Sequence, residues 1–273
     1  MSDARPSVLR FEHVTVSFDD LEALHDVSFD TVESESRVIL GAAGSGKTIL
    51  LKVAMGLIPP TSGKVYAFGQ DLTAMGERQL FQIRSRIGML FQESALFDSL
   101  NIEENVAYPL LNQMSLKVPR EQVHPKVAEA LNFVELGGTL EKFPSELSGG
   151  MRRRAAIARA VVTGPPLILY DSPTAGLDPI TAHTIIALLI KERDQSHTTT
   201  LVVTHRYQDG NLIANFRYNS ERGELEPAGK GSGRRYKTTF MVLREGRLVF
   251  EGDQDQLEAS KDDYVTKFFK RRE

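Results

Sequence analysis

Apolar and polar residues alternate along the first stretch of the chain. The alternation runs from Val8 to Val32 and predicts antiparallel strands, because successive side chains of a strand point to opposite faces. A short apolar strand over 36–40 follows, then a glycine-rich stretch, then a run with helical spacing over 49–57. The order strand, loop, helix therefore forms one unit. The same patterns predict a strand over 63–68, a helix over 77–85 and a strand over 87–91.

Helical spacing dominates the middle of the chain. It extends from Asn101 to Val162 with breaks at residues such as Pro119 and Pro125, which predicts a helical insert. Two short aliphatic runs, 167–170 and 200–203, then flank a helical run over 181–193. That alternation predicts parallel strands joined by a crossover helix.

The last part of the chain falls into three predicted pieces. The segment from Asp209 to Lys237 is polar and rich in Gly, Arg and Glu, so we expect an extended surface loop or flap. Apolar runs over 239–243 and 247–250 predict a hairpin. An amphipathic helix is expected over 254–270.

The composition is that of an ordinary soluble globular protein. Of the 273 residues, 41% are hydrophobic and 25% are charged, which suffices for one large core. Cysteine is absent, so disulfides and thiolate metal sites are excluded. The net charge is −3, and solvated faces explain the short basic clusters at 152–154 and 270–272. We therefore expect no nucleic-acid partner.

No stretch of the chain is predicted to enter a membrane by itself. The longest apolar runs fall far short of the ~20 residues that span a bilayer. The segment Met1–Pro6 lacks the apolar centre of an export signal. Any membrane role is therefore expected to depend on a partner.

The glycine-rich stretch fits a phosphate-binding loop. It matches the pattern Gly, four residues, Gly, Lys, Ser or Thr, between a strand and a helix. Glycines let several backbone N–H groups point at phosphate oxygens, and the helix N-terminus adds its positive end. We expect Lys47 to reach the outer phosphates of ATP and the Thr48 hydroxyl to ligate Mg²⁺. The predicted nucleotide-contacting residues are Gly41, Ala42, Ala43, Gly44, Ser45, Gly46, Lys47, Thr48 and Ile49.

A carboxylate at the end of a buried strand completes the predicted metal site. The strand over 167–170 is followed directly by Asp171. In P-loop proteins such an aspartate holds Mg²⁺, usually through water, so we expect Asp171 to lie opposite Thr48. The predicted cofactors are thus ATP and Mg²⁺.

A further motif identifies a family. The run from Leu147 to Met151, with Ser148, Gly149 and Gly150 at its centre, strongly resembles the signature sequence of ABC ATPases, with Met where glutamine is commonest. The resemblance extends over about 8–257, and its motifs stand in the family's order.

The resemblance implies roles for four more residues. Gln92 is similar to the Q-loop glutamine, a catalytic residue and Mg²⁺ ligand. Asp178 resembles the D-loop aspartate beside the nucleotide, and His205 resembles the catalytic switch histidine. Phe18 matches the aromatic residue that stacks on adenine.

The signature itself is a second anion site. Ser148, Gly149 and Gly150 open a predicted helix, so backbone N–H groups and the helix dipole are available there as in the first loop. One chain would then carry two phosphate half-sites. The family resemblance implies a head-to-tail homodimer in which the signature of one subunit covers the nucleotide on the other.

The resemblance also implies the fold. It is an α/β P-loop NTPase of the ABC ATPase type, with a RecA-like core, an antiparallel β subdomain and an inserted helical subdomain. We expect one ABC ATPase domain over 8–257, its helical subdomain at about 93–162 and an extra loop or flap at about 209–237. A C-terminal helical tail is expected over 258–273.

One catalytic position departs from the family pattern. The residue after Asp171, normally glutamate, is Ser172. A hydroxyl cannot take a proton from water as a carboxylate does, and losing a general base typically costs 10²- to 10⁴-fold in rate. We expect ATP to bind and close the dimer, while hydrolysis is slow or is assisted by His205 or Asp178.

Other segments resemble one branch of the family. The runs 88–101 and 104–110, and the arginines after Met151, are similar to the Mla/Mce-type lipid transport ATPases. That similarity implies an integral membrane permease, a periplasmic lipid-binding MCE protein beyond it, and phospholipid or another hydrophobic cargo. The Q-loop and helical insert would form the groove for the permease, with the chain peripheral at the cytoplasmic face of the inner membrane.

Two alternatives stay open. A nucleotide-gated clamp that hydrolyses ATP weakly is motivated by Ser172. A soluble ABC protein outside transport is the other, although such proteins commonly duplicate the cassette or carry a long coiled-coil insert, and this sequence shows neither. Copurification with a membrane protein and an ATPase assay would separate these readings.

Overall fold

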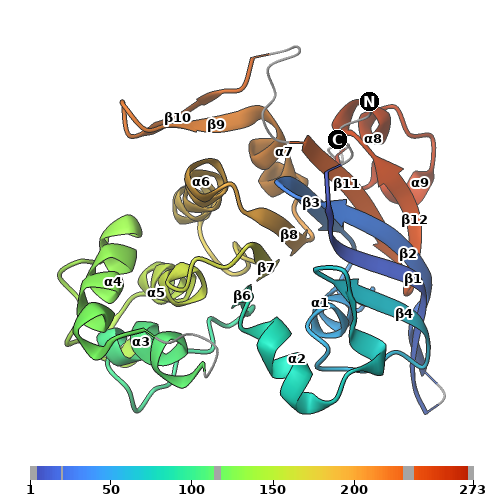
Figure 1. The fold of residues 1–273 in the computed structure, drawn as a ribbon. Helices are drawn as coiled ribbons and strands as arrows, with labels where there is room; N and C mark the ends of the chain where they lie inside the picture. Colours follow the sequence, from blue (N-terminus) through green and yellow to red (C-terminus); the bar gives the residue numbers. More distant parts are fainter. Residues whose placement is uncertain (1–4, 20, 114–117, 230–236, 270–273) are drawn as a thin grey trace.

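A six-stranded sheet forms the centre of the described part of the chain. The computed structural model describes residues 5–19, 21–113, 118–229 and 237–269. In this sheet the strand order is β12-β11-β3-β8-β7-β6, with all neighbours parallel except β12 against β11 (Figure 1). The strands are β3 (Glu35–Leu40), β6 (Ile87–Leu90), β7 (Leu167–Asp171), β8 (Thr199–Thr204), β11 (Lys237–Arg244) and β12 (Arg247–Gly252). The predicted parallel strands and the C-terminal hairpin are thus confirmed.

Both faces of this sheet are covered, so its inner strands are apolar throughout. In β8, Leu201 and Val203 contribute to one hydrophobic cluster and Val202 to the other. The first cluster packs against α1 (Lys47–Ala54), α2 (Glu77–Arg84) and the antiparallel sheet. The second packs against α5 (Gly149–Val161), α6 (Pro179–Ser196) and α7 (Tyr207–Asn215). The two layers are visible on opposite sides of the sheet in Figure 1.

The N-terminal strands form a separate antiparallel sheet, as their alternating pattern predicts. Its order is β2-β1-β4-β5, and the rings of Phe11 and Phe29 stack across β1 and β2 with centroids 4.6 Å apart. The elements are β1 (Ser7–Phe18), β2 (Leu21–Val32), β4 (Ser62–Ala67), β5 (Gln70–Asp71) and the short 3-10 helix η1 (Leu72–Ala74).

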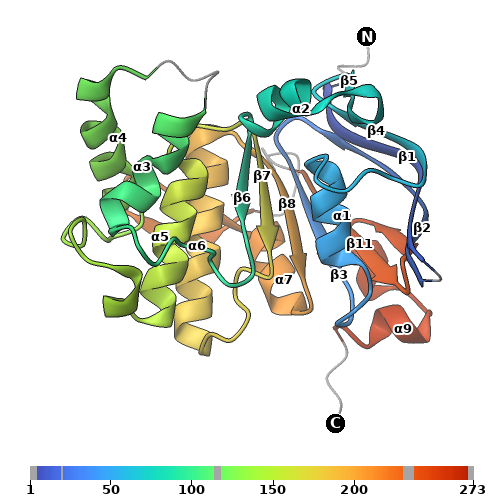
Figure 2. The same cartoon turned by 90° about the horizontal axis from the view of Figure 1, so that it is seen from below.

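Helices gather at the other end of the molecule, beside β6 (Figure 2). They are α3 (Ile102–Asn112), α4 (Arg120–Phe133) and α5, with the 3-10 helix η2 (Pro144–Glu146) before α5. The buried Asn105 holds the preceding loop, because its amide donates to the carbonyls of Phe97, Leu100 and Asn101. The break predicted at Pro125 is wrong: this proline lies inside α4, and only Pro119 stands at the helix boundary.

The segment expected to be an extended loop over 209–237 instead begins within a helix. α7 starts at Tyr207, and β9 (Phe216–Asn219) and β10 (Glu224–Pro227) then pair as a hairpin. Gly210 favoured a loop in the sequence, yet a Cβ there would lie 2.6 Å from the ring of Phe240, so its absence lets α7 pack on β11. Residues 230–236 of the expected loop lie outside the described residues.

The single helix expected over 254–270 is also wrong. The structure has two short helices, α8 (Gln254–Glu258) and α9 (Asp263–Thr266). The interruption has a local cause, because the Asp262 carboxylate accepts bonds from two N–H groups of α9 and so starts a new helix. Residues 270–273 of the expected tail lie outside the described residues. Within the described ranges, no helix has the length and apolarity that a bilayer span requires.

Candidate functional site

The carboxyl ends of four neighbouring strands meet at one edge of the six-stranded sheet. Leu40 of β3 pairs with Thr204 of β8, and Asp171 of β7 pairs with Val203 of β8. The last residue of β6 lies level with the middle of this set, because Leu90 pairs with Tyr170. The segments that follow these strands therefore start side by side, as Figure 2 shows for β6, β7 and β8. Sequence-predicted residues from four separate motifs are brought together here.

The predicted phosphate-binding loop, 41–48, joins β3 to α1, and its backbone conformation depends on glycine. Gly44 and Gly46 have φ of 76° and 99°, and α1 begins at the next residue, Lys47. At Gly46 a Cβ would lie 2.5 Å from the carbonyl oxygen of Ala23 on β2, so the antiparallel sheet packs directly on the loop. The local conformation thus requires glycine both for its dihedral angles and for the close approach.

Lys47 closes over the loop from which it emerges. Its Nζ donates to the carbonyl oxygens of Gly41 and Ala42 at 2.8 and 2.7 Å, and to Oγ of Ser45 at 3.3 Å. Burial lowers the pKa of the ammonium, and the nearby Asp171 carboxylate partly opposes that shift. An anion at the loop would offer this cation charged acceptors in place of two neutral carbonyls.

Thr48 and Asp171 bring two hard oxygen donors together. The Thr48 hydroxyl donates to Oδ2 of Asp171 at 2.9 Å, and Asp171 is only 3% exposed. Hydroxyl and carboxylate oxygens, with phosphate oxygens from a nucleotide, are the ligands that Mg²⁺ prefers. The donor set therefore fits Mg²⁺, and the predicted position of Asp171 opposite Thr48 matches the geometry.

Ser172 turns its hydroxyl toward the same carboxylate. Its Oγ donates to Oδ1 of Asp171 at 3.1 Å, and its backbone has a φ of 49°. The backbone N–H of Ser172 donates to the carbonyl of Val203 at 2.9 Å, which holds the residue at the strand end. The hydroxyl proton is thus engaged with Asp171, and the side chain carries no carboxylate that could accept a proton from water.

Gln92 and His205 follow the ends of β6 and β8, and both side chains are exposed. Thr204, the residue before His205, is held by a buried carboxylate. Its hydroxyl and that of Thr174 both donate to Oδ2 of Asp209, at 2.8 and 2.6 Å. Asp209 therefore joins the segment after Asp171 to the segment that carries His205. Sequence patterns gave no sign of this, because Asp209 lay in a stretch interpreted as a surface loop.

Arg153 ties α5 to the same region. Its guanidinium donates to the carbonyl of Phe91 at 3.0 Å and to that of Ala175 at 3.5 Å, and the side chain is 6% exposed. Burial lowers the pKa of Arg153, while Asp171 and Glu93 oppose that shift. The expectation that the basic cluster 152–154 is a solvated face is wrong for this residue, whereas Arg152 is exposed. The arginine run alone did not indicate which member is buried.

The second predicted half-site lies at the start of α5. Ser148 is the N-cap, and its hydroxyl accepts from the N–H of Met151 at 3.2 Å. Gly150 packs on the first turn of α6, because a Cβ there would lie 2.6 Å from Cγ2 of Thr181, and Asp178 caps that helix through the N–H groups of Ile180 and Thr181. A hydrogen bond from the Thr181 side chain, together with these capping bonds, lowers the pKa of Asp178. Among the described residues, no hydrogen bond joins 148–150 to the loop 41–48.

Phe18 stands at the end of β1, 44% exposed, and pairs with Leu21 across the hairpin. Two residues after Leu21, the carbonyl of Ala23 approaches Gly46 of the loop. The ring therefore lies at the end of β1, next to the strand β2 that contacts the loop, and it is partly exposed.

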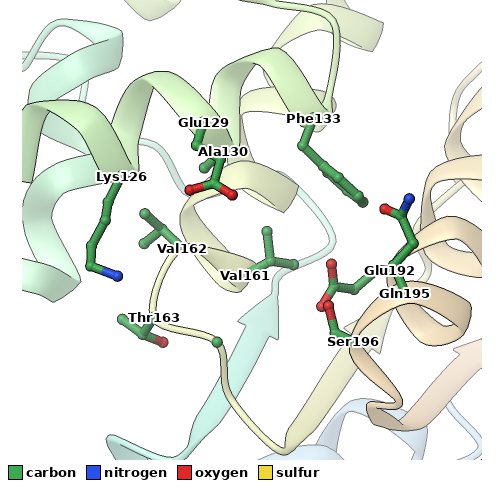
Figure 3. A pocket seen from close by; sticks show the side chains of 11 residues that line it. Lys126, Glu129, Ala130, Phe133, Val161, Val162, Thr163, Glu192, Gln195 and Ser196 are labelled. Atoms are coloured by element: carbon green, nitrogen blue, oxygen red, sulfur yellow. The ribbon is translucent and has the colours of Figure 1, made fainter.

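Two of the hollows beside the helices are lined in part by α5 or the residues that follow it. A groove of about 390 Å³ is lined by β6, the segment after it, α3 and α5. Two partly exposed rings line it, Phe97 and Tyr108, and their centroids lie 4.7 Å apart. Arg159 lines it too and holds the loop after β6 through the carbonyls of Ser94 and Ala95, both at 2.8 Å. A separate cavity of about 400 Å³ lies between α4, α5 and α6, where Glu192 and Phe133 face it (Figure 3). No residue of the loop 41–48 lines either hollow.

Comparison with known proteins decides the family. Residues 24–175 match the family model described as ABC transporter. The chain belongs to the ABC transporter ATP-binding family. It is similar to the intermembrane phospholipid transport system ATP-binding protein MlaF of Haemophilus influenzae. The two are 31% identical over 264 residues, and the match covers 97% of this chain and 90% of that protein.

Two further comparisons bear on the subunit. The chain is 40% identical over 192 residues to the "Probable ribonucleotide transport ATP-binding protein mkl" of Mycobacterium leprae, which covers 70% of this chain; the chain thus spans about half, 55%, of that relative. Its fold is similar to the dimeric ATP-binding cassette MJ0796 bound to ADP and Pi, with a TM-score of 0.75, 29% identity, and 90% and 98% of the two chains covered. The expected P-loop fold of the ABC ATPases is confirmed.

Proposed function

We propose that this ABC subunit binds ATP and Mg²⁺ between two copies of itself and uses the closure to drive a membrane permease that moves phospholipid or another hydrophobic cargo. The observation that carries the proposal is the Thr48–Asp171 pair, 2.9 Å apart, beside the ammonium of Lys47. Lys47 supplies a cation for phosphate, and Thr48 and Asp171 supply two oxygens for Mg²⁺. All three lie at the edge of the sheet where the parallel strands end. Bound Mg²⁺ would neutralise charge on the phosphates.

The remaining nucleotide residues take roles around this pair. The loop 41–49 surrounds the phosphates and Phe18 stacks on the base. Gln92 and His205 approach the terminal phosphate from the segments after β6 and β8. Gln92 is in addition a ligand of the metal. The exposure of Gln92 and His205 supports these roles, because neither side chain is committed to the core.

Two half-sites on one chain support a head-to-tail homodimer. Ser148, Gly149 and Gly150 offer a helix N-terminus without a hydrogen bond to the loop 41–48 within the described ranges. A second copy would bring this N-terminus, and Asp178 next to it, to the nucleotide of the first. The dimeric state of the similar cassette MJ0796 agrees with this arrangement.

Hydrolysis by this dimer is slow. Ser172 lacks a carboxylate, and its hydroxyl donates to Asp171, so the side chain offers no general base for the attacking water. Lys47, Thr48 and Asp171 still bind the nucleotide, so closure does not depend on rapid cleavage. A weakly hydrolysing clamp is accordingly the second candidate function, favoured by this one residue.

The groove beside Phe97 and Tyr108 suits a helix of the permease. Both rings are 42% exposed, and the groove borders the segment that follows β6, which carries Gln92. A helix seated there would contact the helical subdomain, about 93–162, and the nucleotide site at once. We infer one domain over 8–257 with the tail 258–273 attached, peripheral at the cytoplasmic face of the inner membrane.

The cargo assignment depends on relatives rather than on the site. The similarity to MlaF, named for intermembrane phospholipid transport, spans 97% of this chain, whereas that to mkl, named for ribonucleotide transport, spans 70%. The longer match favours phospholipid, with an MCE lipid-binding protein as a further partner on the periplasmic side.

Reconstitution tests the proposal. The chain and the multi-span protein that copurifies with it are placed in vesicles that contain a fluorescent phospholipid and an acceptor protein outside. ATP with Mg²⁺ should transfer the lipid, and Lys47→Ala should abolish transfer. A change of Tyr108→Ala in the groove should lose the membrane partner, whereas Phe81→Ala, an equally exposed aromatic on α2, should retain it. Absence of any membrane partner would favour the soluble ABC protein and contradict the proposal.

A further inference from the structure

A tyrosine of the C-terminal segment touches the phosphate-binding loop. The hydroxyl of Tyr264, on α9, accepts a hydrogen bond from the backbone N–H of Ala42 at 3.2 Å. The same hydroxyl donates to the carbonyl oxygen of Leu243, at the end of β11, at 3.3 Å. Because its one proton is used on Leu243, the oxygen faces Ala42 as an acceptor. One side chain thus joins the loop, the central sheet and the C-terminal segment.

The ring that carries this hydroxyl is held from several sides. The guanidinium of Arg244 lies over it at 5.3 Å, and the ring of Phe268 meets it edge-on at 5.4 Å. The next residue, Val265, is buried at 1% exposure, and Asp262 caps α9 through two N–H groups. The hydroxyl is therefore fixed in place without help from the loop, and its position does not depend on Ala42.

Ala42 of the loop makes two hydrogen bonds, one to Lys47 and one to Tyr264. Ala42 is exposed, and its carbonyl accepts from the ammonium of Lys47 at 2.7 Å. If Lys47 turned to a phosphate, it would give up that bond, whereas the bond from the Ala42 N–H to Tyr264 could remain. The same corner is tightly packed, since a Cβ on Gly41 would lie 2.7 Å from the Leu243 carbonyl that Tyr264 also binds.

We propose that Tyr264 is a positioning residue of the nucleotide site, whose hydroxyl holds the Ala42 amide and keeps the first turn of the loop in its phosphate-binding shape after Lys47 has moved to the nucleotide. The C-terminal segment 253–269 is then part of the site. This inference rests on the proposed binding of ATP at residues 41–48.

A second tyrosine provides a matched control. The hydroxyl of Tyr207 donates to Glu258 and accepts from Gln254 at 2.7 Å, so it also fastens the C-terminal segment. None of its hydrogen bonds reaches the loop 41–48. Tyr207→Phe and Tyr264→Phe each delete one hydroxyl that ties the C-terminal segment to the rest of the chain, and each keeps the ring. Both variants are expected to fold.

The test measures the affinity of the purified full chain for ATP with Mg²⁺, together with hydrogen exchange of the Ala42 amide. Tyr264→Phe should weaken binding roughly two- to tenfold, the scale of one hydrogen bond, and should speed exchange at Ala42. Tyr207→Phe should leave both unchanged. Equal effects of the two variants, or an unchanged affinity in Tyr264→Phe, would overturn the inference.

A third variant separates this inference from the proposed function. Lys47→Ala should abolish tight ATP binding. If it does and Tyr264→Phe binds ATP like the unchanged chain, the role of Tyr264 is wrong while the nucleotide site stands. If Lys47→Ala binds ATP normally, the phosphate assignment itself is wrong.

Discussion

The Thr48 hydroxyl donates to Oδ2 of Asp171 across 2.9 Å, joining residues 123 positions apart. Thr48 lies in the first turn of α1, and Asp171 is the last residue of β7. The parallel register aligns the ends of β3, β8 and β7, so the contact is a consequence of the sheet rather than of a local loop. A divalent cation bound by these two oxygens would replace the hydrogen bond between them with two metal–oxygen contacts.

The first prediction concerns the metal. Thr48→Val removes one oxygen donor and keeps the shape of the side chain. We expect affinity for ATP in the presence of Mg²⁺ to fall roughly tenfold, which corresponds to about 1.4 kcal/mol. Affinity measured with a chelator should be nearly unchanged. Isothermal titration with and without Mg²⁺ checks this, and an equal loss in both conditions would show that Thr48 acts on the nucleotide without the metal.

Ser172→Glu restores a carboxylate next to Asp171. We expect turnover at saturating ATP to rise roughly 10²- to 10⁴-fold, because the new side chain accepts a proton from the attacking water. Ser172→Gln is the matched control, since it has the same size without the charge. The backbone there has a φ of 49°, so both variants bear the same conformational strain. Equal steady-state phosphate release by the two variants would refute a missing general base.

Binding of ATP should weaken at alkaline pH. Burial lowers the pKa of Lys47 below its ordinary value of 10.5, so its ammonium loses the proton sooner than an exposed lysine. Phosphate favours the charged form; affinity is therefore constant below the pKa of Lys47 and declines as pH rises through it. Titrations between about pH 7 and about pH 10 check the slope. The weak residual binding of Lys47→Ala, measured at high ATP concentration, should not change with pH over this range. A similar decline in that variant would assign the pH dependence to another group.

Asp209 should contribute strongly to stability. It is 2% exposed and accepts from the hydroxyls of Thr174 and Thr204. Asp209→Ala leaves both hydroxyls without this acceptor, at a cost of about 3 kcal/mol in the free energy of unfolding. Gln208→Ala, at the exposed neighbouring position, is the control. Urea denaturation measures both, and midpoints that agree would mean that the network contributes little.

The parts of the site that the sequence predicts are those in which chemistry and spacing occur together. The glycines before Lys47, and Asp171 after an apolar run, each indicate their expected chemistry within a few consecutive residues. The strands around them were predictable for the same reason, because apolar runs in a parallel sheet covered on both faces are continuous. The loop and Asp171 then meet at one edge of the sheet because β3, β8 and β7 are parallel neighbours.

Other residues could not be predicted because their roles depend on distant partners. Arg153 bonds Phe91 from 62 positions away, and Tyr264 bonds Ala42 from 222 positions away. Each belongs to a stretch whose local pattern indicates only a charged or amphipathic surface. The helix α7 was missed because Gly210 is unfavourable in an isolated helix, and its benefit arises only from packing on Phe240.

Light scattering of the purified chain, with Mg²⁺ and a non-cleavable ATP analogue, tests most directly whether two copies complete each other's nucleotide site. The account predicts a mass twice the 30.4 kDa of one chain, and no doubling for Lys47→Ala or for Ser148→Arg, which blocks the second half-site while leaving the first intact. A mass of one chain at saturating nucleotide, or a Ser148→Arg variant that doubles like the unchanged protein, would contradict it.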